Sequence, residues 1–225
     1  MHIEPGVVTG AKLALGSVTA AGAATVSAKL VWDNLVQRGA ASLIARSTMA
    51  TAATLVFFEL LPHLAVGPSE VHLILGSTLL LMLGTAPAAV GLALGLLLQG
   101  LLMSPFDLPQ YGMNVTTLLV PLLALHGVTK AVVARGTAYV DLTYAQALKL
   151  SVTYQAGVVA WVAFWVIWGQ GASVATLASL GTFGAAYMTV VLLEPLVDLA
   201  VLAGAKSLRG LKDSGLVTPR LFAAA

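Results

Sequence analysis

Seven apolar stretches constrain what this chain can fold into more than any other feature of its sequence. A helix needs about 20 mostly apolar residues to cross the ~30 Å hydrocarbon core of a bilayer. The stretches cover 7–31, 47–62, 71–84, 87–103, 114–132, 148–168 and 174–200. Only Thr85 and Ala86 separate the third from the fourth, so these two form either a tight hairpin or one broken unit. The sequence therefore predicts an all-α membrane protein, a polytopic bundle of about seven transmembrane helices.

Charge is too scarce to cover a soluble protein of this size. Charged residues make up 9% of the 225 residues and apolar residues 59%, whereas soluble domains have roughly 25% charged residues. This excludes a soluble enzyme, a disordered tail and a nucleic-acid binder. Cysteine is absent, which also excludes disulfides and thiolate metal sites. We expect residues 1–225 to form a single integral membrane domain.

The distribution of charge predicts an N-terminus outside and a cytoplasmic C-terminus. In that orientation ten of the eleven Lys and Arg residues lie on or beside the inner face, where such residues are enriched. They are Lys29, Arg38, Arg46, Lys130, Arg135, Lys149, Lys206, Arg209, Lys212 and Arg220. Four acidic residues lie near the outer edge, namely Glu4, Glu59, Glu70 and Asp107. Such an acidic mouth would concentrate cations before they bind.

The first stretch is expected to remain in the mature chain as a helix. Val26-Ser27-Ala28 resembles a signal-peptide cleavage site, but residues 1–5 carry no Lys or Arg and Lys12 interrupts the apolar run. Lys12 is expected to pair with Glu4 or Glu59, or to extend toward the headgroups.

Two carboxylates lie inside the last stretch. Glu194 and Asp198 are four residues apart and so share one face of a helix. A relay for protons or cations is one interpretation of intramembrane carboxylates. We favour the simpler one, in which they pair with Lys206 or Arg209 where the helix leaves the bilayer.

His2 stands where a side chain can join the N-terminus in chelation. With a free amino group on Met1, a metal ion meets three nitrogens in a row: the amine, the deprotonated His2 amide and the His2 Nδ1. These close a five-membered and a six-membered ring. One more imidazole would complete a planar set of four nitrogens, a geometry associated with Ni(II) or Cu(II). Without such a partner, His2 would be an ordinary frayed terminal residue.

His72 is the histidine best placed to complete this set. It opens the third apolar stretch at the outer level, where an ionisable residue is costly and is by default a functional candidate. His63 is the weaker contender because it lies in the preceding loop. His126 lies deep in the fifth stretch and is expected to be structural.

Three segments carry a family resemblance: Met1-His2-Ile3-Glu4-Pro5-Gly6, Pro68-Ser69-Glu70-Val71-His72-Leu73 with the Leu75-Gly76-Ser77-Thr78-Leu79-Leu80 that follows, and Tyr111-Gly112-Met113-Asn114. In these the chain resembles the CbiM/NikM family, the substrate-binding membrane component of energy-coupling factor (ECF) transporters for cobalt and nickel. The order and spacing agree over most of the first 130 residues, and the remainder matches only as apolar spans. Residues 104–110 depart from the Gly-Gly turn that family members often have, which leaves metal selectivity open.

The resemblance implies a ligand set. In it, Met1 supplies the amine, His2 the amide and imidazole nitrogens, and His72 the last imidazole. Asn114 would steady the N-terminal segment without binding the ion. The expected cargo is Co(II) or Ni(II), with no resident cofactor.

The resemblance also implies partners, which would supply the energy. The sequence has no G-x-x-x-x-G-K-[ST] phosphate loop, so we expect no ATP hydrolysis and no enzyme activity from this chain. Two cytoplasmic ATPases would act through a transmembrane coupling subunit in a bacterial or archaeal cell membrane. The surface that meets them would include 32–46 and 133–147, with Arg38, Arg46 and Arg135.

Two alternatives stay open on the sequence. The chain could bind an organic micronutrient in a pocket with aromatic walls such as Tyr111, Tyr154 and Trp161. It could also be a non-transporting membrane scaffold held by small-residue faces such as Gly91-x-x-x-Gly95. A scaffold would make His2 dispensable, whereas metal capture makes it essential.

Overall fold

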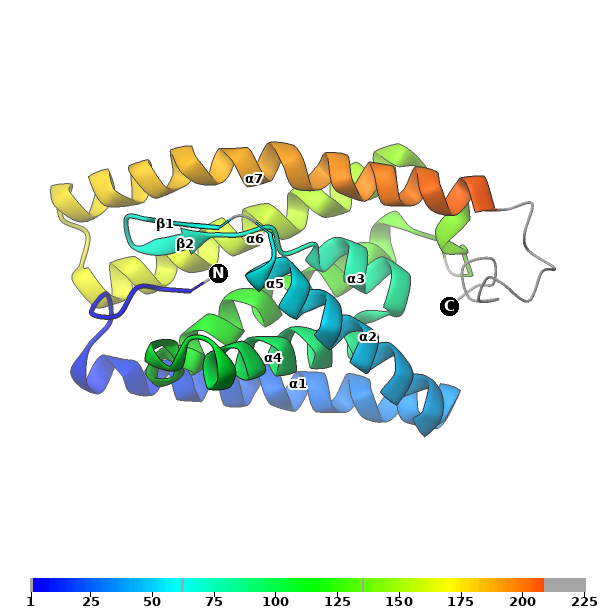
Figure 1. Ribbon diagram of the computed structural model, residues 1–225, viewed down its shortest axis with the longest axis horizontal. Helices are drawn as coiled ribbons and strands as arrows, with labels where there is room; N and C mark the ends of the chain where they lie inside the picture. The colour runs from blue at the N-terminus through cyan, green and yellow to red at the C-terminus, as the bar shows by residue number, and fades with distance from the viewer. Residues whose placement is uncertain (1, 62, 135, 209–225) are drawn as a thin grey trace.

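Long helices packed side by side make up most of the chain (Figure 1). The computed structural model describes residues 2–61, 63–134 and 136–208. The long helices are α1 (Ala14–Arg38), α2 (Ala40–Glu59), α4 (Thr85–Leu102), α5 (Tyr111–Val132), α6 (Tyr144–Gln170) and α7 (Val174–Ser207). The shorter elements are η1 (Gly10–Leu13), β1 (Leu64–Val66), β2 (Ser69–Val71), α3 (Gly76–Leu83), η2 (Pro105–Gln110) and η3 (Tyr139–Asp141).

Six helical stretches in the described parts of the chain are long and apolar enough to cross a membrane. They are Gly10–Arg38, Ala40–Glu59, Thr85–Leu102, Pro105–Val132, Tyr144–Gln170 and Val174–Ser207. The predicted all-α polytopic bundle is confirmed, and the chain is a multi-pass membrane protein.

The predicted third span, 71–84, differs from the expectation. Its only helix is α3, and eight residues rise about 12 Å, far short of the hydrocarbon core. The hairpin of β1 and β2 takes up the residues before it, and the left-handed Leu75, at φ 54°, starts the short helix. Gly84, at φ 93°, then turns the chain into α4, which runs back in the opposite direction to α3 (Figure 1), so these two stretches form a tight hairpin.

Small residues allow α2 and α4 to pack closely against each other. A Cβ added at Gly91 would lie 2.2 Å from the Cβ of Ala50, and one added at Gly95 would lie 2.6 Å from that of Thr54. No side chain fits at either position, because protein interiors leave no room for such overlaps. The Gly91-x-x-x-Gly95 pattern therefore serves packing within the bundle.

The N-terminal segment enters the bundle and is clamped by α6. His2, Ile3, Val7 and Val8 are all buried. A Cβ added at Gly169 would lie 2.1 Å from the Val7 carbonyl oxygen. Lys12 Nζ donates to the Gly169 carbonyl at 2.9 Å. The expected pairing of Lys12 with Glu4 or Glu59 is therefore wrong, because the end of α6 offers carbonyl oxygens and the negative pole of a helix dipole.

The two carboxylates of α7 cap the start of α3. Both Glu194 and Asp198 are buried. Glu194 accepts hydrogen bonds from the backbone N–H of Ile74, at 3.1 Å, and of Leu75. Asp198 accepts from the hydroxyls of two residues in the first turn of α3, Ser77 and Thr78.

The expected pairing of these carboxylates with Lys206 is not found. Among the described residues no ion pair joins either carboxylate to Lys206, whose Nζ instead lies 5.4 Å from the centre of the Tyr144 ring. Arg209 lies outside the described residues. The N-terminus of a helix has unsatisfied N–H groups and a positive dipole, which explains why acidic side chains gather at α3.

Candidate metal centre

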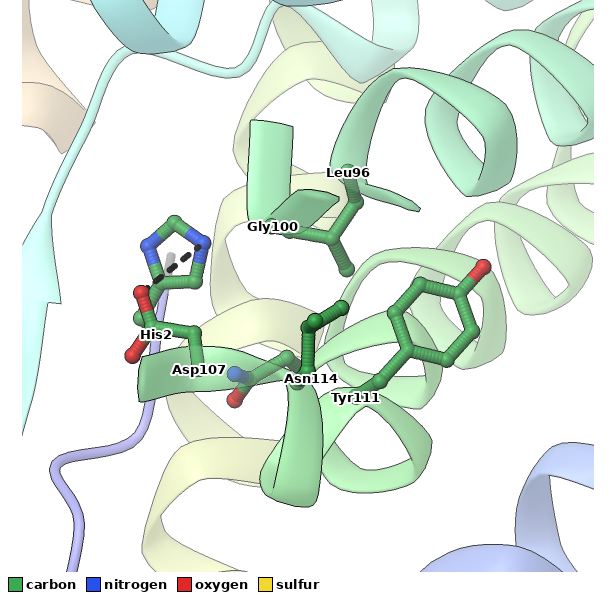
Figure 2. A pocket seen from close by; sticks show the side chains of 7 residues that line it. His2, Leu96, Gly100, Asp107, Tyr111 and Asn114 are labelled. Carbon is green, nitrogen blue, oxygen red and sulfur yellow. Dashed lines mark ion pairs between the residues drawn. The ribbon is translucent and has the colours of Figure 1, made fainter. Parts of the chain in front are cut away.

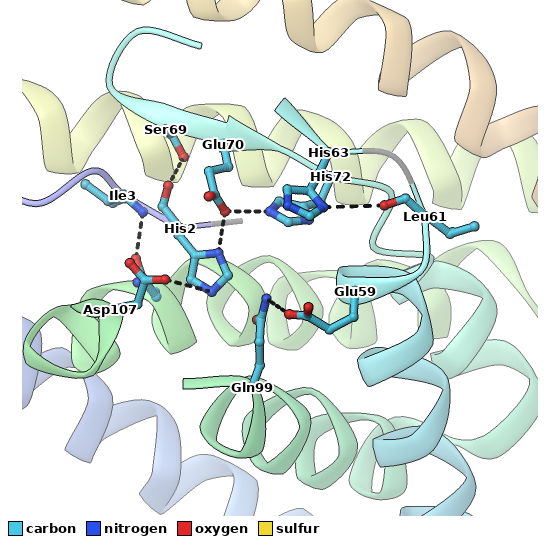
Figure 3. A network of polar contacts seen from close by, with 11 residues as sticks. His2, Ile3, Glu59, Leu61, His63, Ser69, Glu70, His72, Gln99 and Asp107 are labelled. Atoms are coloured by element: carbon cyan, nitrogen blue, oxygen red, sulfur yellow. Dashed lines mark hydrogen bonds and ion pairs between the residues drawn. The ribbon is translucent and has the colours of Figure 1, made fainter. Parts of the chain in front are cut away.

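The N-terminal segment lies against the β1–β2 hairpin, and this pairing positions His2. Ile3 forms an isolated antiparallel bridge with Ser69. The His2 carbonyl accepts hydrogen bonds from the Glu70 N–H, at 2.9 Å, and from Ser69 Oγ, at 2.8 Å. Glu4 N–H donates to the Pro68 carbonyl at 3.0 Å. Backbone bonds therefore hold the His2 main chain beside β2 (Figure 3).

The rings of His2 and His72 meet at one carboxylate oxygen. Glu70 Oε2 lies 2.5 Å from His2 Nδ1 and 2.7 Å from His72 Nε2 (Figure 3). The ring centroids are 5.5 Å apart, at an interplanar angle of 72°. Both histidines are almost fully buried, with 3% and 1% of their surface exposed. One ligand atom from each of the three residues lies within 4.8 Å of the other two. Such a group of two nitrogens and one oxygen can hold a transition-metal cation.

Burial keeps His72 in the form that binds metals. Burial lowers the pKa of the His72 imidazole to about 3, although Glu70 beside it acts in the opposite direction. Burial alone would raise the pKa of Glu70, but hydrogen bonds to His2 and His72 outweigh burial and hold it well below its ordinary range. At neutral pH the centre therefore offers a neutral imidazole and a carboxylate anion.

Asn114 of α5 contacts the N-terminal segment and not the imidazoles. Its Oδ1 accepts a hydrogen bond from the Ile3 N–H at 2.8 Å, in a buried contact. The contact spans 111 positions in the sequence and fixes the residue next to His2. Met1, the predicted amine ligand, lies outside the described residues.

The other two histidines occupy different places. The exposed His63 stacks on the ring of His72, with centroids 4.9 Å apart and planes 13° from parallel. Phe58 lies at 5.3 Å from the same ring, so an aromatic group flanks the centre. His126 lies elsewhere and shares a 2.7 Å hydrogen bond with Thr85 at the start of α4.

The predicted acidic residues gather at this end of the bundle. Asp107 Oδ2 lies 3.9 Å from His2 Nε2 (Figure 2), and Glu59 accepts a hydrogen bond from Gln99 at 2.7 Å. Burial raises the pKa of Glu4, and the charges of Glu70 and Asp107 raise it further. Glu4, Glu70 and Asp107 are therefore close enough to influence one another beside the two histidines.

Glu70 is the residue whose role sequence reasoning missed, because it was counted only as part of the acidic mouth. A usable signal was its spacing of two from His72, since residues i and i+2 of an extended segment point to the same side. The ring contacts of Phe58 and of His63 with His72 had no comparable signal in the sequence.

The pocket beside His2 is small. Its free volume is about 0 Å³, and it is lined by His2, Leu96, Gly100, Asp107, Leu108, Tyr111 and Asn114 (Figure 2). Pockets for drug-sized ligands measure roughly 300–1,000 Å³. The aromatic residues of the micronutrient alternative do not line one cavity. Tyr154 is fully buried and donates to the Leu118 carbonyl at 3.4 Å, while Trp161 donates to Thr116 at 3.1 Å.

Comparisons with known proteins point in the same direction. The model of the family described as cobalt uptake substrate-specific transmembrane region, CbiM, matches residues 2–210. A crystal structure described as that of a truncated transition metal transporter has a TM-score of 0.67 and 15% sequence identity, and the match covers 92% of this chain and 97% of that one. That likeness shows a shared fold. No curated protein sequence matches the chain.

Proposed function

The chain belongs to the cobalt uptake substrate-specific transmembrane family, and we propose that it is the substrate-capture component of an ECF importer for cobalt or nickel ions. In this proposal it lies in a bacterial or archaeal cell membrane with the acidic end outside. A transmembrane coupling subunit and cytoplasmic ATPases supply the energy.

The observation that carries this proposal is the buried convergence of His2 and His72 on one oxygen atom. Buried polar groups are costly unless they are paired or bind a ligand. Two imidazoles from positions 70 residues apart have here been brought to one point by a terminal segment and a hairpin. Metal capture explains why the fold tolerates this arrangement inside an apolar bundle.

The proposed ligands are the Met1 amine, the His2 amide nitrogen and Nδ1, and one ring nitrogen of His72. When an ion binds, the amine and the amide lose their protons and the His2 chelate closes around it. The hydrogen bonds to the His2 carbonyl and the Ile3 N–H hold the segment in place beforehand. This ordering lowers the entropy lost when the ion binds.

Neither alternative has comparable support. The pocket at His2 is too small for most organic ligands. A scaffold would have no use for a buried pair of imidazoles on a carboxylate, and its most conspicuous small-residue pattern is already used between α2 and α4.

Calorimetric titration of the purified protein with Co(II) and Ni(II) tests the proposal. We expect native protein to bind one equivalent and His72→Ala to lose at least about 100-fold in affinity, because a ligand is gone. His126→Ala is the matched control, since it removes a histidine away from the centre. Equal binding by native protein and His72→Ala, or no binding by native protein, would contradict the proposal.

A further inference from the structure

Glu70 is spaced from the two histidines as a neighbouring metal ligand would be. Metal-bound nitrogen and oxygen atoms lie about 2.0–2.2 Å from the ion, so two ligands at right angles are about 3 Å apart. Glu70 Oε2 lies 2.5 Å from one ring nitrogen and 2.7 Å from the other (Figure 3). One ligand atom from each of the three residues lies within 4.8 Å of the other two, so a single ion can bind all three residues.

The proposed chelate, on which this inference rests, determines which position Glu70 can take. The amine, amide and Nδ1 of the terminal chelate occupy three successive corners of a square, and His72 takes the fourth, next to Nδ1. No corner is left. A donor adjacent to both His2 Nδ1 and His72 must then lie above or below the plane. We propose that Glu70 is a fifth, axial ligand of the captured ion and biases this centre toward Co(II) over Ni(II).

A backbone hydrogen bond to His2 holds Glu70 in place for this role. Its own N–H donates to the His2 carbonyl at 2.9 Å, so the backbones of Glu70 and His2 are in register. Its side chain retains 23% of its surface exposed, which leaves the carboxylate at the entrance to the site. An arriving cation therefore meets Glu70 before it meets the buried imidazoles.

Asp107 is a carboxylate of the same charge that cannot bind this ion. It lies 3.9 Å from His2 Nε2, the nitrogen on the far side of the ring from Nδ1. The two ring nitrogens point in different directions, so an ion bound at Nδ1 lies away from Asp107. Variants of Glu70 and Asp107, compared with each other, therefore separate the effect of an axial bond from the effect of one nearby negative charge.

The two ions differ in what an axial ligand contributes. Planar Ni(II) with four nitrogens has a filled orbital pointing along the axis, so an axial oxygen adds little. Co(II) has one electron fewer, and in the same field its axial orbital is only half filled, so it accepts a fifth donor. A charge beside the site attracts both divalent ions alike. The ratio of the two dissociation constants is therefore the quantity that an axial ligand changes and a nearby charge does not.

The test compares Glu70→Gln with Asp107→Asn in calorimetric titrations with Co(II) and Ni(II), together with electron paramagnetic resonance of the Co(II) forms. We expect Glu70→Gln to raise the Co(II) dissociation constant at least about tenfold more than the Ni(II) constant. The Co(II) spectrum should change as its axial field weakens. Asp107→Asn should raise both constants by the same factor, within about threefold, and leave the spectrum unchanged.

Glu70→Asp and X-ray absorption of the native Co(II) protein keep the inference testable if Glu70→Gln does not fold. The shorter side chain keeps the charge but cannot reach, so its Co(II) affinity should also fall, and absorption should show four nitrogens and one oxygen. An unchanged ratio in Glu70→Gln, or four-coordinate Co(II) in native protein, would overturn the inference and leave the chelate standing. Native protein that binds neither ion would instead overturn the proposed function itself.

Discussion

At the scale of single residues, the centre depends on side chains that position the N-terminal segment. Asn114 is the main one outside the hairpin, since it accepts the hydrogen bond of the buried Ile3 N–H. A buried donor left without a partner costs about 1–3 kcal/mol. If Asn114 is removed, the N-terminal segment can avoid that cost by moving out of the bundle, and His2 would then move away from His72.

We therefore expect Asn114→Ala to lower metal affinity by about 10–100-fold, the range seen when residues that orient metal ligands are removed. Asn114→Asp keeps the acceptor oxygen and should retain most of the affinity. Calorimetry of both variants checks this. Equal affinity in native protein and Asn114→Ala would show that the segment is held without Asn114.

The pH dependence of binding is also decided by single residues. Because the pKa of His72 is about 3 in the metal-free protein, this imidazole stays neutral between pH 8 and 6 and takes up no proton there. The amine and amide must still lose theirs. We expect affinity to fall about tenfold or more per pH unit from pH 8 to 6, one factor of ten for each proton released. Titrations at both pH values measure this, and a flat profile would exclude the amine–amide chelate.

The same residue affects the stability of the metal-free protein. A histidine whose pKa is lower in the folded than in the unfolded state destabilises the fold as pH drops below its unfolded value of about 6.5. Between pH 7 and pH 4, above the folded pKa of about 3, the thermal midpoint of native protein should fall. His72→Gln should show a shallower slope over that interval. Identical slopes of the thermal midpoint against pH in the two proteins would show that a group other than His72 takes up the proton.

At the scale of elements, the end of α6 holds the N-terminal segment at a distance that only glycine permits. A methyl group at position 169 would overlap the Val7 carbonyl oxygen, at 2.1 Å. That oxygen belongs to the backbone, so the segment itself must move.

We expect Gly169→Ala to weaken metal binding by at least about tenfold, because the ligand-bearing segment is displaced. Gly181→Ala in α7 is the control, since an added Cβ there meets nothing within 4 Å. That change should leave affinity unaltered and stabilise the helix by about 0.5–1 kcal/mol. If both variants bind metal like native protein, the contact between α6 and the N-terminal segment does not affect metal binding.

The capping of α3 by α7 is the second contact between elements that affects the centre. Glu194 holds the N–H groups of Ile74 and Leu75, which follow His72 by two and three residues. Removing it in Glu194→Ala leaves two buried donors unsatisfied, and we expect a loss of about 2–5 kcal/mol of stability. Thermal unfolding in detergent measures this. Glu194→Gln keeps one acceptor and should fall between the two.

At the scale of the whole molecule, the hairpin that carries Glu70 lies toward one end of the bundle and the end of α1 toward the other (Figure 1). The orientation inferred from Lys and Arg places the hairpin outside. The chain has no cysteine, so single cysteines can report on it. Leu64→Cys in β1 should react with an impermeant maleimide in intact cells, whereas Gln37→Cys in α1 should react only after permeabilisation. The reverse pattern of labelling would show that the metal centre faces the cytoplasm.

The sequence was sufficient to predict the long helices, because the length of an apolar stretch is a local signal. It was also sufficient to predict that His2 and His72 lie together, because the N-terminal motif is local too. It could not show that only Gly76–Leu83 of the stretch 71–84 is helical, since the polar residues of this stretch resemble an ordinary helix start. Nor could it reveal Glu194 as a cap for residues about 120 positions earlier. For Lys12 the sequence suggested a carboxylate partner or the headgroups, and it could not show that the carbonyl of Gly169 at the end of α6 accepts its hydrogen bond.

The central claim is that the captured ion is held by the chain's own N-terminus. One extra glycine before Met1 keeps every side chain but moves His2 out of chelating register. We predict that native protein binds Co(II) or Ni(II) in a calorimetric titration and that the extended form loses at least about 100-fold in affinity. Equal binding by the two forms would contradict the claim and leave the ion with His72, Glu70 and His63 alone.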